Sequence, residues 1–228
     1  MIFLFLCCFL PLSSFGASPI NFSSETISMV VSLAFLSLAP ILLLMMTSFT
    51  RLVIALSFVR QGMGVQNMPP GSALSAIALF LTFFIMHKPI ESAYQAGIKP
   101  YLEQKITLDK AFEKAAEPMR EFMLKNVKEK DLEVFSNIAK VELEDKESIP
   151  NRVLIPSFML SEIKRGFEMG FLILLPFTII DIVVSIVLVS LGMMMVPPIS
   201  IALPLKVILF SIVDGWGMLF GSLVKSFS

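Results

Sequence analysis

The sequence predicts an all-α integral membrane protein, with about four long apolar helices in broken hairpins and a small helical insert. Of its 228 residues, 56% are hydrophobic and the mean hydropathy is +0.83. The apolar residues form long uninterrupted blocks, which is typical of membrane spans rather than of a soluble core. Charge is confined: 12 of the 18 Lys/Arg and 13 of the 18 Asp/Glu lie between Lys88 and Arg152. The formal net charge is zero, so nucleic acid is not an expected partner.

Residues 1–17 are predicted to be a cleavable signal peptide. The stretch Ile2–Leu12 has the length of an apolar signal core, and small residues follow it up to Ala17. It is too short to span a membrane comfortably as a retained anchor, although a positive segment before it is missing. Cys7 and Cys8 are the only cysteines, and their adjacent positions suit neither a disulfide nor a metal site.

The first apolar hairpin is expected over residues 18–87. Ile27–Met46 is the first spanning candidate, interrupted at Pro40, and apolar character continues past Arg51 to Val59. Glycines and the Pro69-Pro70 pair then end the helix. Ala73–Met86 is the second candidate; at 14 residues it is short for a full crossing.

Residues 88–155 are expected to form a charged helical domain outside the membrane. Apolar residues recur there at helical spacing, with a kink or break predicted at Pro118 and a further amphipathic helix over Asp131–Val141. The charges are typical of solvated helix faces. The segment contains neither a glycine-rich phosphate loop nor a nucleophile constellation.

Residues 156–228 are predicted to form a second apolar hairpin with a methionine- and proline-rich tip. Its arms, Gly166–Leu191 and Ile199–Val224, are each long enough to span. Between them the chain reads Met193, Met194, Met195, Val196, Pro197, Pro198. The two prolines mark a break. Methionine is adaptable, so the three side chains are either apolar filler at the tip or a surface that seals against different shapes.

Four spans with an external amino terminus place the 88–155 domain outside as well. The loop with Arg51 and Arg60, and the tip with nearby Lys206, then lie on the cytoplasmic side. Positive charge in short loops favours this orientation.

Charges within apolar segments require partners, because each costs roughly 2.5–3.5 kcal/mol in a membrane. Asp181, Asp214 and Lys206 are such charges, and they are expected to pair within or between subunits. The enzymatic alternative is an intramembrane aspartyl protease with Asp181 and Asp214 as a dyad. Two lone acids without a characteristic motif favour the structural role. His87, the only histidine, is expected to be a polar interface residue.

Two GxxxG patterns predict close helix packing: Gly166 with Gly170, and Gly217 with Gly221. The prolines inside the apolar segments also allow a stand-alone channel or transporter, although no internal repeat supports the latter. The residues by themselves therefore favour an assembling pore or channel subunit.

Several collinear motifs make the chain resemble a known family. They are Met46-Thr-Ser-Phe-Thr-Arg51, Leu56-Ser57 to Arg60-Gln61, Pro69-Pro70, Ala78-Leu-Phe-Leu-Thr-Phe-Phe84, Leu160-Ser-Glu162, Gly170-Phe-Leu172, Asp181, Leu191-Gly-Met-Met-Met-Val-Pro-Pro198, Leu203-Pro-Leu-Lys206 and Val213-Asp-Gly-Trp216. Together they cover most of residues 28–224 and resemble the FliP/SctR family of type III secretion export-gate proteins. The Thr-Arg at 50–51 and the Leu-Thr-Phe-Phe run at 81–84 are more similar to the flagellar branch, FliP, than to the virulence injectisome branch.

The resemblance implies a core pore subunit without enzymatic activity, cofactor or metal. Five copies are expected to assemble with FliQ-like and FliR-like subunits into a closed cone in the bacterial inner membrane, at the flagellar basal body. The cone would conduct unfolded flagellar subunits and contact other export-apparatus proteins and membrane lipid. The resemblance assigns a pore gasket to Met193, Met194 and Met195, an inter-subunit ion pair to Lys206, and a role in joining neighbouring copies to the periplasmic 88–155 domain.

Overall fold

The structure is a computed structural model that describes residues 24–65, 69–141 and 148–227. The predicted signal peptide, with Cys7 and Cys8, lies outside these residues. Every regular element in the described ranges is a helix. The helices are α1 (Ser24–Met45), α2 (Phe49–Met63), α3 (Gly71–Ile85), α4 (His87–Ala93), the π-helix η1 (Tyr94–Ile98), α5 (Lys99–Leu102), α6 (Leu108–Asn126), α7 (Glu129–Ala139), α8 (Asn151–Ser190), α9 (Pro198–Ile212) and α10 (Gly215–Lys225). This confirms the all-α class.

The chain separates into two compact units, residues 1–40 and 41–228. The described part of the first unit is the amino-terminal portion of α1, whose exposed side chains include Met29 and Leu33. All packing described below belongs to the second unit.

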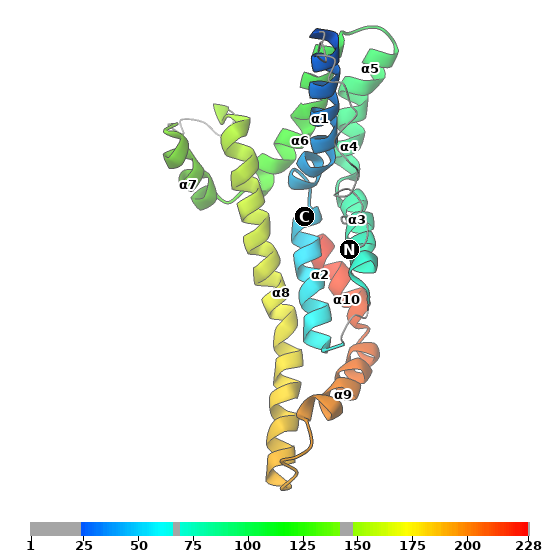
Figure 1. The fold of residues 1–228 in the computed structure, drawn as a ribbon, viewed down its shortest axis with the longest axis vertical. Coiled ribbons are helices and arrows are strands. Elements are labelled where there is room, and N and C mark those ends of the chain that lie inside the picture. The colour runs from blue at the N-terminus through cyan, green and yellow to red at the C-terminus, as the bar shows by residue number, and fades with distance from the viewer. Residues whose placement is uncertain (1–23, 66–68, 142–147, 228) are drawn as a thin grey trace, which may run out of the picture. The chain divides into compact units, whose positions relative to one another are not determined.

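The core of the second unit is built around α2. Its residues Leu52, Ala55, Leu56 and Val59 are fully buried against α3, α8 and α10. α8 runs alongside α2 (Figure 1), and Leu219 and Leu223 of α10 belong to the same buried cluster.

Glycines bring α8 close to α2. A Cβ at Gly166 would touch Ile54, and one at Gly170 would collide with the ring of Phe58. The first predicted GxxxG pair therefore packs two helices of the same chain.

Prolines inside helices do not interrupt them here. α8 is a single helix of 40 residues that contains Pro156 and Pro176 and begins at Asn151, ahead of the expected start at Pro156. α6 likewise continues through Pro118, so of the predicted kink or break, the break does not occur. An internal proline costs a helix roughly 3 kcal/mol. Packing of α6 against α4, η1 and α8 offsets that cost, because tertiary contacts override local propensity.

The last apolar segment, Ile199–Val224, which is predicted as a span, consists of two helices joined at a bend. α9 ends at Ile212, α10 begins at Gly215, and the two meet at 67°. Asp214 adopts a left-handed backbone conformation (φ 50°), which ends the first helix. Gly215 follows against the ring of Phe210, where a Cβ would not fit.

By length and composition, one described helix, α8, could cross a membrane by itself. The number rises to three if two bent pairs each count as one span: α3 with the helices up to Leu102, bent by 62°, and α9 with α10. The structure thus supports a membrane-spanning chain and leaves four spans as a proposal.

The charged insert is helical and attaches closely to the apolar body. η1 packs on α6 through Gly97, which abuts Ala111 and Ala115. α7 packs on the first turns of α8, where Leu132 joins the buried Phe158. α8 itself runs across the expected boundary between residues 155 and 156.

Candidate functional site

The turn between α8 and α9 presents three exposed methionines on a defined backbone. After α8 ends at Ser190, Gly192 adopts a left-handed conformation (φ 75°) that glycine tolerates without strain. The amides of Gly192 and Met193 donate to the carbonyls of Val189 and Leu188, both at 3.0 Å. These two bonds form a Schellman motif, which satisfies carbonyls that a helix end leaves without partners.

The prolines start the next helix. Pro197 precedes α9 and Pro198 is its first residue, where a missing N–H costs nothing. Val196 packs beside the buried Val184, Leu188 and Ala202, so the base of the turn is fixed.

The methionines themselves are uncovered. Met193 is 44% exposed, Met194 79% and Met195 96%. Three adjacent apolar side chains left exposed on a fixed turn are typical of a surface that contacts something else.

Lys206 ties α9 to two other helices just behind this tip. Its Nζ donates to Asp181 Oδ2 on α8 at 2.6 Å and to the carbonyl oxygen of Gly62 at 3.0 Å. The Gly62 carbonyl lies at the end of α2, where the helix provides no partner for it. Lys206 is almost fully buried and Asp181 is half exposed. The sequence left pairing within or between subunits open, and the structure pairs these two residues inside one chain.

The second predicted acid, Asp214, has a different role. It sits at the amino-terminal end of α10 and accepts a hydrogen bond from the amide of Gly217 at 3.4 Å. An aspartyl dyad needs two carboxyl groups that share a proton. Among the described residues, the partner of Asp181 is Lys206 and that of Asp214 is a backbone amide, so the two acids do not form such a pair.

The remaining predicted site residues are spread over the molecule. Gly217 lies against the carboxylate of Asp214, whereas nothing lies within 4 Å of a Cβ built at Gly221. His87 is exposed at the start of α4, 3.6 Å from Glu91. The described residues contain no cluster of side chains that could hold a metal ion.

A buried charge network around Arg51 was not predicted. Its guanidinium makes a bidentate pair with Glu162: Nε donates to Oε2 at 3.0 Å and Nη2 donates to Oε1. Nη1 donates to the backbone oxygen and the hydroxyl of Ser226, at 3.0 and 3.1 Å. The guanidinium carbon lies 3.5 Å from the centre of the Phe227 ring. Arg51 and Glu162 are each only 1% exposed, so this network joins α2, α8 and the carboxyl-terminal residues in a dry environment.

Both charges were visible in the sequence. Arg51 interrupts a largely apolar run and Glu162 follows one, and opposite charges buried in apolar surroundings are expected to pair. Their separation of 111 positions in the chain hid which two would meet.

A second polar cluster fastens the insert to α8. Asp131 of α7 accepts from the hydroxyl of Ser161 at 2.7 Å and pairs with Lys164. Burial raises the pKa of the Asp131 carboxyl, but the hydrogen bonds from Lys164 and Ser161 outweigh it, so the pKa lies below its ordinary value. Lys128 adds an ion pair with Glu168 at 2.7 Å. The Asp131 carboxylate is therefore charged at neutral pH and holds α7 against α8.

Comparison with known proteins explains the combination of an apolar helical body, a charged insert and a methionine tip. The sequence model of the FliP family matches residues 32–223, which is most of the chain. The chain belongs to the FliP family. The matched range includes the Arg51–Glu162 pair, the Lys206–Asp181 pair and the whole tip.

Individual FliP relatives are similar over nearly their full length. The flagellar biosynthetic protein FliP of Bacillus subtilis (strain 168) is 46% identical over 93% of this chain and 96% of the relative. The protein of that name from Caulobacter vibrioides is 44% identical over 97% of this chain and 86% of the relative. The FliP protein from Aquifex aeolicus is 41% identical over 89% of this chain and 86% of the relative. The similarity to FliP proteins thus covers the insert as well as the apolar segments.

Proposed function

We propose that this chain is a core pore-forming subunit of the flagellar type III protein export gate. In this role it conducts unfolded flagellar subunits across the bacterial inner membrane and is needed to assemble the flagellum. Membership of the FliP family supports the proposal, and the relatives named above carry flagellar rather than injectisome names. It acts by forming a passage, with no catalytic step.

The observation that carries the proposal is the exposed methionine triplet on a fixed turn. Met194 and Met195 are almost fully exposed and Met193 is partly exposed, while the turn beneath them is held by backbone bonds and by Val196. In a ring of copies, three unbranched thioethers per copy would surround one axis. Such side chains close against each other when the passage is empty and rearrange around a passing chain.

The assembly and topology follow the same proposal. Five copies join FliQ-like and FliR-like subunits, and four apolar segments cross or line the membrane in two hairpins, residues 18–87 and 156–228. The charged 88–155 domain lies in the periplasm and contacts neighbouring copies. Residues 1–17 are removed as a signal peptide. The Lys206–Asp181 pair sits behind the tip, where it would fix the direction of the methionines toward the axis.

A triple substitution tests the gasket. Met193, Met194 and Met195 are replaced by Ala in the complete gate, and assembly and small-solute permeability are measured in cells. We expect an assembled gate that leaks, because alanine cannot fill the space that the thioethers occupied. The control is Met29→Ala, which removes a similarly exposed methionine elsewhere. A triple variant that assembles and stays impermeable to small solutes would contradict the gasket role.

Deletion of the gene in its own bacterium tests the flagellar assignment. The proposal requires loss of filaments, with any injectisome left active. Filaments that persist after the deletion would contradict it.

A further inference from the structure

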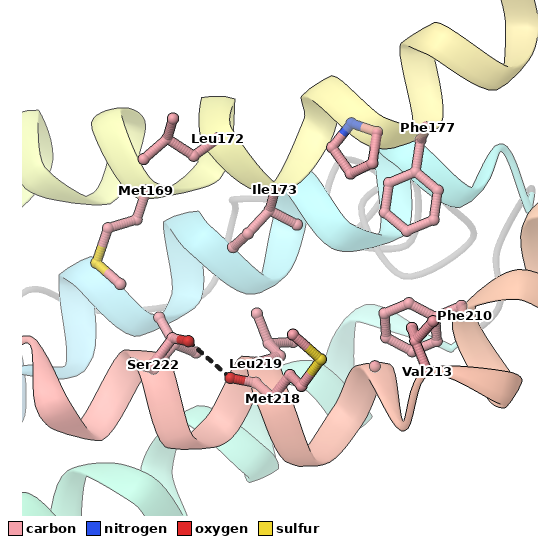
Figure 2. A pocket seen from close by; sticks show the side chains of 12 residues that line it. Met169, Leu172, Ile173, Phe177, Phe210, Val213, Met218, Leu219 and Ser222 are labelled. Atoms are coloured by element: carbon pink, nitrogen blue, oxygen red, sulfur yellow. Dashed lines mark hydrogen bonds between the residues drawn. The ribbon is translucent and has the colours of Figure 1, made fainter.

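An apolar groove lies between α8 and α10, apart from the tip and the charge networks (Figure 2). Its volume is about 370 Å³. The floor consists of buried side chains, Phe177, Leu219 and Leu223, while Leu172 and Met218 on the rim are 65% and 64% exposed. Ser222 provides the one hydroxyl among the lining residues, and it already donates to the carbonyl of Met218 at 2.7 Å. The groove therefore offers an apolar ligand a complete apolar lining.

The two helices run in opposite directions along the groove. Met169 of α8 faces Ser222 of α10 at one end, and Phe177 lies near Phe210 and Val213 at the other (Figure 2). Residues four or seven positions apart lie on one face of a helix. Arg165 therefore continues the lining face of α8 one turn beyond Met169, and Lys225 continues that of α10 beyond Ser222. Both cations lie at the same end of the groove.

These two cations are not neutralised locally. Arg51, beside them, is paired with Glu162, and Lys128 is paired with Glu168. Arg165 is within electrostatic range of Arg51 and Glu162. Within the described ranges, the side chains of Arg165 and Lys225 make no hydrogen bond or ion pair. The carboxylate of Glu162 is already bound by Arg51, so the apolar groove ends beside two positive charges that no described carboxylate pairs with directly.

We propose that this groove binds one acyl chain of an anionic phospholipid, whose phosphate lies between Arg165 and Lys225. The occupant must be apolar along most of its length and anionic at one end, and a membrane supplies that combination as single molecules. An apolar helix from a partner or a second copy would cover the lining but leave both cations unpaired. The lipid joins α8 to α10 and covers the exposed rim.

The protein contains a single tryptophan, which makes the site directly measurable. Trp216 is the second residue of α10 and packs edge-on against Phe210, a lining residue, with ring centres 5.2 Å apart. The full chain is purified in detergent and titrated with phosphatidylglycerol that carries brominated acyl chains, which quench a nearby indole. Phosphatidylcholine with the same chains is the comparison. We expect phosphatidylglycerol to quench at about 25-fold lower concentration, since each of the two basic side chains near an anionic headgroup contributes about fivefold.

Three variants locate the ligand. Arg165→Gln with Lys225→Gln should remove the preference for phosphatidylglycerol and leave phosphatidylcholine binding unchanged. Ser222→Phe should fill the groove and weaken quenching by both lipids. Lys110→Gln with Lys114→Gln, on the exposed face of α6, removes the same charge elsewhere and should change neither. Thermal unfolding of each variant shows that it has folded.

Several results would overturn the proposal. These are equal quenching by the two lipids, an unchanged preference in the Arg165/Lys225 variant, unchanged quenching in Ser222→Phe, or full displacement of the lipid by inorganic phosphate. Crosslinking that places a second copy in the groove would assign it to a protein partner instead. The inference extends beyond the export role, and the two can fail separately because lipid binding is measured on the purified chain without export.

Discussion

Arg51 and Glu162 bury two full charges in an apolar helical body. The pair is bidentate, and Ser226 accepts the remaining guanidinium hydrogen bonds. A buried pair of this kind contributes little net stability relative to apolar replacements, whereas removing one partner leaves an uncompensated charge. The network therefore determines which helices pack together, and it adds little to the free energy of unfolding.

Each single substitution at this pair should cost more stability than the double substitution. Arg51→Met or Glu162→Leu alone should lower the free energy of unfolding by about 3–5 kcal/mol, while the double variant should recover most of that loss. Thermal unfolding in detergent measures both. Lys105→Gln, which breaks the exposed pair with Glu103, is the control and should change stability by less than about 1 kcal/mol. Additive losses in the double variant would contradict the buried-pair interpretation.

Asp131 makes the attachment of the insert dependent on pH. Its pKa is lowered in the folded protein, so its contribution is present above the unfolded pKa, about 3.9, and is lost as the pH falls through the folded value. The difference in Tm between wild type and Asp131→Asn should be constant from about pH 8 to 5 and shrink below about pH 4. Glu133→Gln, on the exposed side of α7, should show no such dependence. A Tm difference that grows as the pH falls would contradict the lowered pKa of Asp131.

At the scale of elements, the glycines of the two GxxxG patterns are used differently. Gly170 is in contact with Phe58 of α2, whereas Gly221 on α10 faces open space in the single chain. The same sequence pattern therefore packs α8 against α2 within the chain, whereas on α10 the glycine Gly221 has no neighbour within 4 Å of a Cβ.

Alanine at each glycine should separate these roles. Gly221→Ala should raise stability by about 0.5–1 kcal/mol, because alanine is the better helix former. Gly170→Ala should lower it by about 1–3 kcal/mol, because the new methyl group displaces the Phe58 ring. Chemical unfolding of the purified chain compares the two. Equal effects would show that α8 can move away from α2 freely.

At the scale of the whole second unit, the carboxyl terminus joins the insert to the apolar body. Phe227 stacks on Phe122 of α6, with ring centres 6.2 Å apart, and its ring lies against the guanidinium of Arg51. Arg51 and Phe227 thus connect α2, α6 and α8 through residues that follow α10. The terminal residues act as a structural junction.

Deleting residues 226–228 should cost about 2 kcal/mol, on the scale of hydrogen bonds to a charged group. Combined with Arg51→Ala, the loss should be smaller than the sum by about 1 kcal/mol or more, because both changes remove the same contacts. Tm values of the two single variants and the double variant give this coupling. The deletion combined with Lys105→Gln is the control and should be additive. If the stability losses of the deletion and of Arg51→Ala are also additive, the terminal residues do not act through Arg51.

Sequence reasoning reached the features that depend on local composition. It placed the helical class, the charged insert, the amphipathic helix now seen as α7, and the tip with Met193 and Pro197. It did not show that α6 continues through Pro118 or that the last apolar segment bends at Asp214, because tertiary packing and one left-handed residue decided whether each helix continued. It also missed the Arg51–Glu162 partnership, because pairing across 111 positions depends on how the helices are arranged.

The sequence by itself determined that this chain is apolar and helical, and its motifs placed it in the FliP family. Hydropathy, turn residues and motif order are properties of neighbouring positions, so they can be read without coordinates. Only the tertiary structure decided that Lys206 meets Asp181, that Gly170 lies against Phe58, and that α8 and α10 enclose an apolar groove. These features arise where distant segments come into contact, and a buried charge or a missing Cβ has meaning only beside its neighbour.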